Sequence, residues 1–344
     1  MANERRRLGL GVIGAGMASK PHALALQALG ETIAVRGVFR RDREALEAFC
    51  EDYGFTPADS LEALLNDPQV EAVLILTPPN AREALVDAAA RAGKHILMEK
   101  PVERTSAAAE RIVETCEAAG VTLGIIFQHR FRAASEALAA RIADNAFGAL
   151  HAVHLVVPWW RSQQDYYDKP GRGTLEQDGG GVLITQAIHS LDLMLSLTGP
   201  VREVVALAAT TGLHRMETED FVSAGLTFEN GAVGALMATT ANYPGGPEGL
   251  TLNFEKASAT LTAGNLRVMW MDGREEEIGE VSQGGGGADP MAFPFDWHKA
   301  QIADFADAVR EGRQPRSTGR SALAVHRLID ALLRSAREGR RVEV

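Results

Sequence analysis

The first third of the chain alternates short apolar runs with segments of helical periodicity, and this alternation constrains the fold more than any other feature. Apolar runs typical of buried strands lie at residues 8–13, 33–39, 72–76, 95–98 and 122–127. Apolar residues recur at helical spacing in residues 17–29, 43–52, 81–92 and 106–119. Strands that alternate with helices predict a doubly wound parallel sheet covered on both faces, so we expect an α/β domain over residues 1–127.

The pattern changes after residue 128. Strand-like runs lie at residues 150–160, 201–211, 221–227, 231–241, 251–254, 259–262 and 266–271. The last six follow one another without helices, and turn sequences such as Glu229-Asn230-Gly231 and Asp272-Gly273 end two of them. We therefore expect residues 128–344 to form an α+β domain with a mostly antiparallel sheet, and two helices near 297–311 and 320–338 to end the chain.

Composition argues against several classes of partner. The 344 residues carry a formal net charge of -10 and no basic block longer than the arginines at 5–7, so we expect no nucleic acid. Those arginines and the apolar run after them resemble an export signal only superficially, because the run continues into folded-looking sequence. No stretch approaches the roughly 18 to 20 apolar residues of a membrane span. With two cysteines in predicted helices and scattered histidines, we expect no disulfide, no metal site and a cytoplasmic location.

A glycine-rich turn (GAGMAS, residues 14–19) joins the first predicted strand to the first predicted helix. Small residues there let the backbone approach a pyrophosphate, whose charge is stabilised by the amides of a helix N-terminus. We expect Gly14, Gly16, Met17 and Ala18 to bind a dinucleotide, although Ser19 replaces the third glycine of the motif. The alternative is an ordinary tight turn.

Two arginines, Arg40 and Arg41, follow the second predicted strand. A guanidinium at this point favours the 2′-phosphate of NADP, whereas an acid would accept hydrogen bonds from the ribose of NAD. We therefore predict NADP rather than NAD as the cofactor. Alternatively, both arginines belong to a solvated helix N-terminus that Asp42 caps.

The run at residues 95–98, which we number as the fifth strand, ends in Glu99-Lys100-Pro101. A lysine here lies at the carboxyl edge of the sheet, where doubly wound folds bind ligands. Partial desolvation beside a nicotinamide can lower the pKa of a lysine, which then transfers the hydroxyl proton as a hydride moves. The alternative is a lysine of a surface loop.

Several motifs together resemble the Gfo/Idh/MocA family of dehydrogenases: the glycine-rich turn, Thr77-Pro78, the AGKH run at 92–95, Glu99-Lys100-Pro101, and Gly180-Gly181 before His189. The resemblance spans nearly the whole chain. It implies a Rossmann domain followed by an open-faced sheet domain, a tightly held nicotinamide cofactor, and sugar, inositol or related polyol substrates. It also implies that Lys100 is the acid/base residue. We expect further cofactor contacts from Thr77, Pro78, Asn80, Glu99, Lys100 and Gln128.

Residues 182–192 have the pattern of one helix, which puts Thr185, His189 and Asp192 on one face at i, i+4 and i+7. His189, which matches the histidine that partners the lysine in many family members, can polarise the reacting oxygen while Asp192 orients its ring. Many members carry an acid four positions before that histidine, where this chain has Thr185. A Lys-His pair is therefore favoured over a triad, and Thr185 is left as a hydrogen-bonding group. A structural histidine is the alternative.

Aromatic and guanidinium side chains precede the glycines at 179–181. Aromatic faces and fork-shaped donors suit stacking on, and hydrogen bonding to, sugar hydroxyls. The candidate substrate-binding residues are Trp160, Arg161, Tyr167, Arg172, Thr185, Gln186, Lys100 and His189, with Arg130 as a secondary candidate. The alternative is a dimer contact or a packed loop.

These features predict hydride transfer between NADP and a sugar or polyol carbon, with Lys100 and His189 converging on one nicotinamide ring. Two other functions stay open. One is an NAD-retaining enzyme that cleaves glycosidic bonds through transient oxidation. The other is a non-enzymatic NAD(P)-binding regulator, against which the paired acid/base groups argue. An open sheet face predicts a homodimer or homotetramer.

Overall fold

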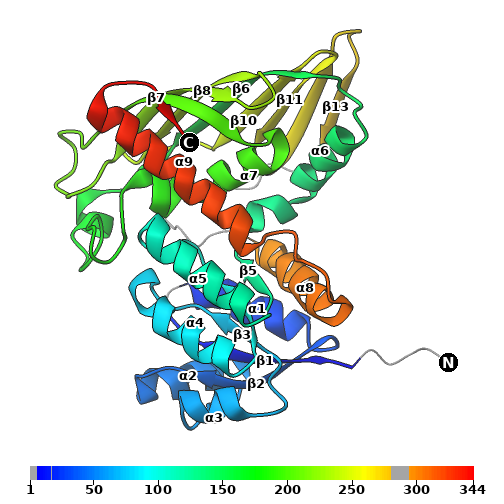
Figure 1. Cartoon of the computed structure of the whole chain (residues 1–344), viewed down its shortest axis with the longest axis vertical. Coiled ribbons are helices and arrows are strands. Elements are labelled where there is room, and N and C mark those ends of the chain that lie inside the picture. The colour runs from blue at the N-terminus through cyan, green and yellow to red at the C-terminus, as the bar shows by residue number, and fades with distance from the viewer. Residues whose placement is uncertain (1–5, 17, 280–293) are drawn as a thin grey trace. The chain divides into compact units, whose positions relative to one another are not determined.

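The computed structural model describes residues 6–16, 18–279 and 294–344. The chain divides into two compact units, whose elements are labelled in Figure 1. The first unit consists of Met1–Ile126 and Pro294–Leu323, and the second of Phe127–Phe293 and Ala324–Val344. Both units are therefore built from two separate stretches of sequence.

The described part of the first unit contains a five-stranded parallel sheet in the order β2-β1-β3-β4-β5. Its strands are β1 (Leu8–Ile13), β2 (Ile33–Phe39), β3 (Ala72–Ile75), β4 (His95–Met98) and β5 (Leu123–Ile125). Its N-terminal segment adds helices α1 (Ser19–Ala28), α2 (Arg43–Tyr53), α3 (Leu61–Asn66), α4 (Arg82–Arg91) and α5 (Ser106–Ala118). The predicted doubly wound sheet is confirmed. The strand that leads to Lys100 is β4, the fourth along the chain, and not the fifth as we numbered it from the sequence. The short helix α3 was not predicted.

The strands β1 to β4 end at one level of the sheet. Ile13 is in register with the last residues of β2 and β3, and the ends of β3 and β4 are also in register. The turn after β1, the arginines after β2 and the Glu-Lys-Pro exit of β4 therefore share one carboxyl edge. The strand order reverses between β1 and β3, which is where folds of this type bind nucleotides.

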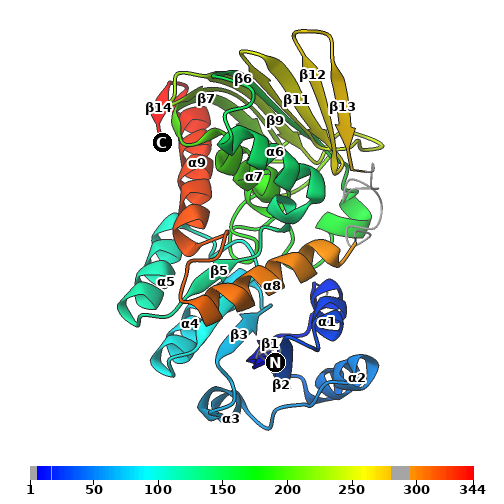
Figure 2. The same cartoon turned by 90° about the vertical axis from the view of Figure 1, so that its right-hand side faces the viewer.

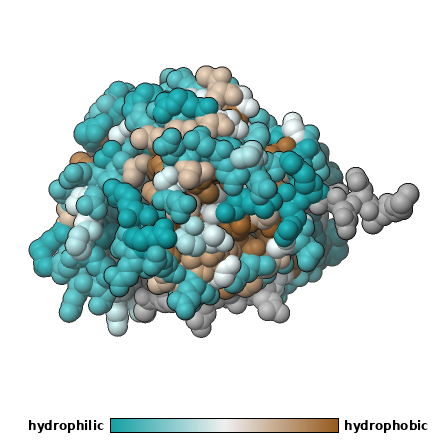
Figure 3. Space-filling view, turned by 90° about the horizontal axis from the view of Figure 1, so that it is seen from below, coloured by the Kyte–Doolittle hydropathy of each residue, from teal (hydrophilic) through white to brown (hydrophobic). Residues whose placement is uncertain are grey.

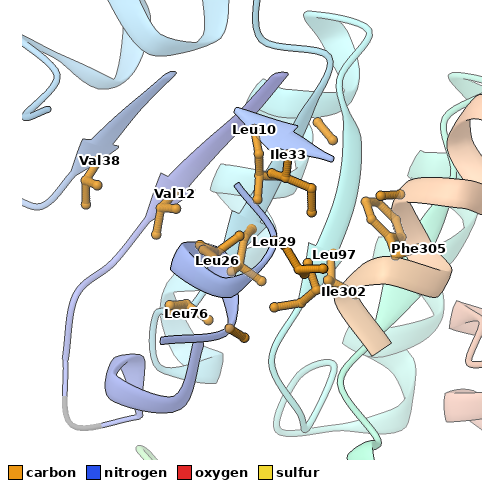
Figure 4. Close-up of a cluster of buried hydrophobic side chains, with 14 of the residues drawn as sticks. Leu10, Val12, Leu26, Leu29, Ile33, Val38, Leu76, Leu97, Ile302 and Phe305 are labelled. Atoms are coloured by element: carbon orange, nitrogen blue, oxygen red, sulfur yellow. The ribbon is translucent and has the colours of Figure 1, made fainter. Parts of the chain in front are cut away.

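Helix α8 (Asp296–Glu311) completes the core of the first unit. Its residues Ile302 and Phe305 are buried in an apolar cluster with Leu26 and Leu97 (Figure 4). Figure 2 shows α1 and α8 on one side of the sheet and α4 and α5 on the other. The predicted second domain included residues 294–323, but this segment belongs to the first unit because the apolar face of α8 is buried there.

The described part of the second unit contains a nine-stranded sheet in the order β13-β12-β11-β10-β6-β9-β8-β7-β14. Its strands are β6 (Leu150–Pro158), β7 (Val201–Ala209), β8 (Phe221–Phe228), β9 (Val233–Thr239), β10 (Gly249–Phe254), β11 (Ala257–Thr262), β12 (Asn265–Trp270), β13 (Glu275–Ile278) and β14 (Val342–Glu343). Only β6 and β9 pair in parallel among these, so the mostly antiparallel sheet is confirmed. The glutamate-rich β13 and the two-residue β14 were not predicted, because neither has a strand-like apolar pattern.

Among the helices that the structure describes, none covers one face of this sheet (Figure 2), as expected for an open-faced sheet. Helices cover the other face (Figure 2): α6 (Ala133–Ala143), α7 (Ile188–Thr198) and the second-unit part of α9 (Gly319–Glu338). The register places apolar side chains together on the uncovered face, where they are 38% to 58% exposed: Val156, Val205, Leu207, Val233 and Met269. An exposed apolar face of this kind is typical of an interaction surface.

No helix within the described residues is long and apolar enough to cross a membrane. Figure 3 shows the surface of the molecule from below, where hydrophilic side chains surround smaller apolar patches, the usual mixture on a protein surface. Cys50 and Cys116, both of which the structure describes, are free and buried in α2 and α5.

Candidate active site

The turn after β1 has the geometry of a nucleotide-binding loop. Gly14 has a φ of +98°, and a Cβ on it would come within 3.1 Å of the Leu76 carbonyl carbon, so any other residue would be strained here. A Cβ on the exposed Gly16 would meet nothing within 4 Å, so the backbone there is open to a ligand. Ser19 closes the turn by donating its hydroxyl to the Gly16 carbonyl at 2.6 Å.

The N-terminus of α1 faces this turn. Helix α1 begins after Ala18, which provides no side-chain cap, so its first amides are not taken by a capping side chain. A pyrophosphate fits such a site because amides and helix dipole both favour negative charge. Met17, which we also expected to bind the cofactor, lies outside the described residues.

The arginines after β2 differ in their surroundings. Arg40 Nη1 donates to the Ala15 carbonyl at 2.5 Å, which holds its guanidinium against the glycine-rich turn. Arg41 is exposed. Asp42 caps α2 by accepting from the Ala45 amide at 3.1 Å, so the capping role considered for it is confirmed. Arg40 is thus the arginine that the structure places at the nucleotide turn.

A buried arginine joins the exits of β3 and β4. Arg82, at the start of α4, is 2% exposed and donates to the Thr77 carbonyl at 2.8 and 2.9 Å. The same guanidinium donates to the carbonyls of Glu99 and Pro101, and to that of Lys100 at 3.4 Å. Burial lowers the pKa of Arg82 to about 10, partly offset by the negative charge of Glu99. It stays charged at neutral pH and fixes the backbone on both sides of Lys100.

The carboxylate of Glu99 is enclosed by polar partners. It accepts from His22 Nε2 at 2.7 Å and from the Lys100 amide at 3.0 Å. Burial alone would raise the pKa of Glu99, but the His22 hydrogen bond and the positive charges of His22 and Lys100 lower it to about 2. Burial lowers the pKa of nearby His298 to about 3. The Glu99 carboxylate, from which we expect a cofactor contact, thus also has hydrogen-bond partners within the protein.

The sequence predicted no metal site, but His22, Glu99 and His298 bring ligand-type atoms within 4.8 Å of one another. These residues come from α1, the β4 exit and α8, so no sequence spacing could reveal them. We interpret the cluster as a hydrogen-bonded network, because the cationic Arg82 and Lys100 also act on the Glu99 carboxylate. A divalent cation would have to compete with both positive charges.

In the second unit, His189 lies in α7 and is 8% exposed. Its ring stacks on His129, with 5.0 Å between centroids, and meets Phe127 edge-on at 5.9 Å. Asp192 does not orient this ring as we expected. Its carboxylate, 0% exposed, accepts from Arg130 Nε at 2.6 Å and Nη2 at 2.5 Å. Burial raises the pKa of Asp192, an effect that Arg130 opposes.

The predicted helix at 182–192 begins as a π-helical segment, Leu183–Ala187, before α7 starts. The π turns change the angular spacing between Thr185 and the later residues, whereas His189 and Asp192 both lie in α7, three residues apart. Thr185 donates its hydroxyl to the Gly181 carbonyl at 2.6 Å and also contacts the Gln186 side chain. Such π segments are frequent at functional sites.

The aromatic approach to this segment centres on Tyr166. The guanidinium groups of Arg161 and Arg172 lie over the Tyr166 ring, and Gln186 donates to the Tyr166 hydroxyl. The predicted Trp160 and Tyr167 have other surroundings. Tyr167 is instead buried, with its hydroxyl 2.6 Å from that of Thr240. Trp160 packs against His214 and Tyr243.

The other expected cofactor contacts occupy varied positions. Thr77 is half-buried and Pro78 and Asn80 are exposed after β3. Gln128 is 6% exposed in the second unit, and its Oε1 has no hydrogen-bond partner among the described residues. A buried amide oxygen in this state is costly and is suited to an external donor.

Two family models match the chain. Residues 8–127 match the oxidoreductase family with an NAD-binding Rossmann fold, and residues 135–260 match the GFO/IDH/MocA C-terminal domain. The chain belongs to the Gfo/Idh/MocA family. The first match covers β1 to β5, so this Gfo/Idh/MocA protein is an NAD(P)-dependent oxidoreductase whose first unit holds the cofactor fold.

Several similar proteins have known names. The Gfo/Idh/MocA chain is 27% identical over 301 residues to 1,5-anhydro-D-fructose reductase of Ensifer adhaerens, covering 83% of each chain. It is 27% identical over 352 residues to D-xylose 1-dehydrogenase (NADP(+)) 2 of Haloferax volcanii, covering 97% of this chain and 99% of the relative. Among solved structures, it resembles the WlbA dehydrogenase from Bordetella pertussis in complex with NADH and UDP-GlcNAcA, with 30% sequence identity and a TM-score of 0.83. The match covers 98% of this chain and 99% of the WlbA chain.

Sequence analysis of this Gfo/Idh/MocA chain missed three residues around the candidate site: Arg82, His22 and His298. An arginine that binds backbone carbonyls leaves no sequence pattern. The histidines lie far apart in the chain and meet only in the fold. Tyr166 and Tyr167 are adjacent, and only the backbone geometry decides which one faces the arginines.

Proposed function

We propose that this protein transfers a hydride between NADP and a carbon of a sugar, inositol or related polyol, with Lys100 as acid/base residue and His189 assisting. The exit of β4 carries the proposal: Lys100 lies on the carboxyl edge that also bears the nucleotide turn, in a chain of the Gfo/Idh/MocA family. Relatives named for 1,5-anhydro-D-fructose and D-xylose support the substrate class.

In this proposal NADP supplies or accepts the hydride. Lys100 Nζ gives a proton to the reacting oxygen, or removes it, and is half-buried with its backbone held by Arg82. The positive charge of Lys100 helps to lower the pKa of the neighbouring Glu99 carboxyl. His189 hydrogen-bonds the same oxygen, and Thr185, which donates to Gly181, accepts from a substrate hydroxyl.

Arg40 supports NADP as the preferred cofactor. Its guanidinium is held at the nucleotide turn, where it can pair with a 2′-phosphate, while Arg41 lies exposed beside it. Gly14, Gly16 and Ala18 would hold the pyrophosphate. Among the relatives one is named for NADP(+) and another holds NADH, so the relatives do not distinguish the two cofactors. The proposal of NADP therefore depends on Arg40.

The test is a screen of sugars and polyols with NADP and with NAD, in which the absorbance of the reduced nicotinamide measures turnover. With a substrate found, Lys100→Ala should lower kcat about 10²- to 10⁴-fold and leave NADP affinity unchanged. Lys256→Ala, which removes an exposed lysine from the second unit, is the matched control. Unchanged kcat in Lys100→Ala would remove this residue from the mechanism.

A second variant tests whether the two residues act as one unit. If His189 serves the same oxygen, the loss in Lys100→Ala/His189→Asn should be smaller than the product of the single losses. Release of sugar from a glycoside without net nicotinamide reduction would point to an NAD-retaining glycoside-cleaving enzyme. NADP binding without turnover of any substrate would point to a regulator.

We further propose a homodimer or homotetramer that buries the open face of the second-unit sheet. The exposed apolar residues Val205, Leu207 and Val233 on that face support this assembly. The free, buried Cys50 and Cys116 suit a reducing compartment, and we propose the cytoplasm.

A further inference from the structure

The histidine that stacks on His189 is hydrogen-bonded to a buried arginine. His129 lies in the short 3₁₀ helix Gln128–Phe131, and its ring lies 5.0 Å from that of His189 between centroids, with 28° between the planes. Arg132 Nη2 lies 2.7 Å from His129 Nε2. Because the nitrogens of a guanidinium donate and do not accept, Arg132 is the donor and His129 Nε2 is the acceptor.

This hydrogen bond determines where the His129 ring carries its proton. An accepting ring nitrogen has a free lone pair, so the single proton of the neutral ring lies on Nδ1. A second proton on Nε2 would set two N–H groups against each other at 2.7 Å and would add a positive charge beside the Arg132 guanidinium. His129 is therefore neutral in this geometry, in its Nδ1-protonated form.

Glu248, the residue before β10, holds the arginine in this position. Its Oε1 accepts from Arg132 Nη1 at 2.8 Å, and both side chains are less than a tenth exposed. Burial lowers the pKa of Arg132, a shift that the negative charge of Glu248 opposes. A buried ion pair rarely stabilises a fold more than apolar side chains of the same volume would, so stability alone does not account for this pair.

A second ion pair fastens the same 3₁₀ helix to α7. Arg130 Nε donates at 2.6 Å to Asp192, which is fully buried and lies three residues after His189. His129 and Arg130 are neighbours in sequence, and each contacts a different residue of α7. The backbone that carries the His129 ring is therefore held against the helix that carries His189.

We infer that Arg132 is a positioning residue for the proposed hydride transfer: it keeps His129 neutral, so that of the two stacked rings only His189 gains or loses a proton. A neutral ring can stack on His189 in either protonation state, whereas two protonated rings 5.0 Å apart would repel each other. The part of His189 in turnover rests on the proposed function. The protonation state of His129 does not.

The protonation state of His129 is tested by ¹⁵N NMR of the full-length protein labelled at its histidine nitrogens. The His129 signals are those that disappear in His129→Asn. In the wild type, Nε2 of His129 should give the signal of an unprotonated nitrogen throughout roughly pH 5 to 8, where histidines ordinarily change charge.

Two substitutions of the arginine separate its donor character from its presence. In Arg132→Gln the amide oxygen can accept, so Nε2 is free to take a proton and the His129 ring should titrate between roughly pH 5 and 8. In Arg132→Lys the ammonium group only donates, so the wild-type signal should persist.

Kinetics test the positioning role with a substrate from the screen. Arg132→Gln should lower kcat about 10- to 100-fold, because small changes of geometry at a reacting group have effects of this size, and should leave KM close to that of the wild type. Arg132→Lys should recover most of the loss. Arg141→Gln breaks a partly exposed ion pair with Glu276 in the same unit, and as the matched control it should leave kcat unchanged.

A further variant covers the case in which Arg132→Gln does not fold. That substitution leaves the Glu248 carboxylate buried without its arginine, which is strongly destabilising. Arg132→Gln/Glu248→Gln replaces the ion pair with two amides and leaves no such charge behind. The same NMR and kinetic results are expected of it as of Arg132→Gln.

Three results would overturn the inference. The first is a wild-type His129 that carries a proton on Nε2. The second is a kcat that stays at the wild-type value although the substitution has changed the protonation of His129. The third is a loss that Arg132→Lys does not recover although the His129 signal is that of the wild type. Failure of the proposed function is recognised separately, as absence of turnover with every sugar and polyol, because NMR reads the state of His129 without substrate.

Discussion

Arg82 in the first unit and Arg161 in the second are both buried, at 2% and 6% exposure, but different partners stabilise them. Arg82 donates to backbone carbonyls on two neighbouring strand exits. Arg161 donates to the Trp160 carbonyl at 2.8 Å and lies over the aromatic faces of Trp159 and Tyr166, with a second guanidinium nearby. Hydrogen bonds to carbonyls use the edge of a guanidinium, whereas stacking uses its face.

This difference indicates how each region should respond to substitution. In the first region the Arg82 guanidinium and the Glu99 carboxylate bind partners within the protein, so buried hydrogen bonds fix the backbone around Lys100. In the second region Arg172 is partly exposed and pairs with Asp178 at 3.2 Å. We therefore expect a substitution at Arg82 to cost more stability than one at Arg172.

The largest effect is expected from Arg82→Met. Methionine keeps much of the volume but leaves the carbonyls of Thr77, Glu99 and Pro101 without this donor in a buried place. We expect a loss of about 3 to 5 kcal/mol in the free energy of unfolding, measured by urea denaturation.

Arg91→Met is the matched control for Arg82→Met, because it lies exposed at the end of the same helix. It should cost no more than a few tenths of a kcal/mol, from the helix dipole. If Arg82→Met cost as little as the control, the β3 and β4 exits would not depend on this arginine, and the contrast between the two regions would fail.

The next effect concerns Glu99, whose pKa of about 2 lies below its ordinary value of 4.5. A carboxylate with a lowered folded-state pKa stabilises the protein fully above pH 4.5 and loses that contribution as the pH falls toward 2. The shift corresponds to stabilisation on the order of 3 kcal/mol.

Unfolding of the wild type and Glu99→Gln at several pH values measures this contribution. The gap in unfolding free energy should be widest above pH 4.5 and should narrow steadily below it. Glu51→Gln, an exposed substitution on α2, should show no such gap. A gap that does not change with pH would mean that Glu99 acts through shape and not through charge.

Much of the fold could be predicted from the sequence, because local patterns determine it. The strands β1, β2 and β4 begin and end where their apolar runs do, and periodicity located α2 and α5 to within a residue. The return of α8 to the first unit was missed because an amphipathic pattern shows that a face is buried but not against which partner.

The site was predicted less completely for the same reason. Lys100, Arg40 and the glycine-rich turn follow strand ends, so their common edge follows from a parallel sheet. The ion pair of Asp192 with Arg130, 62 residues away in sequence, depends on tertiary packing. The π-helical start at Leu183–Ala187 has no periodic signature that distinguishes it from an α-helix.

The smallest effect on stability is expected from Arg172→Gln, and it completes the contrast with Arg82→Met. The Arg172 side chain is 33% exposed and its ion pair with Asp178 is partly screened, so its loss should cost less than about 1 kcal/mol. Relief of the repulsion on Arg161 offsets part even of that. Urea denaturation should give nearly the wild-type midpoint. A stability loss as large as that of Arg82→Met would show that Arg172 holds the loop together, and the second region would then be as self-contained as the first.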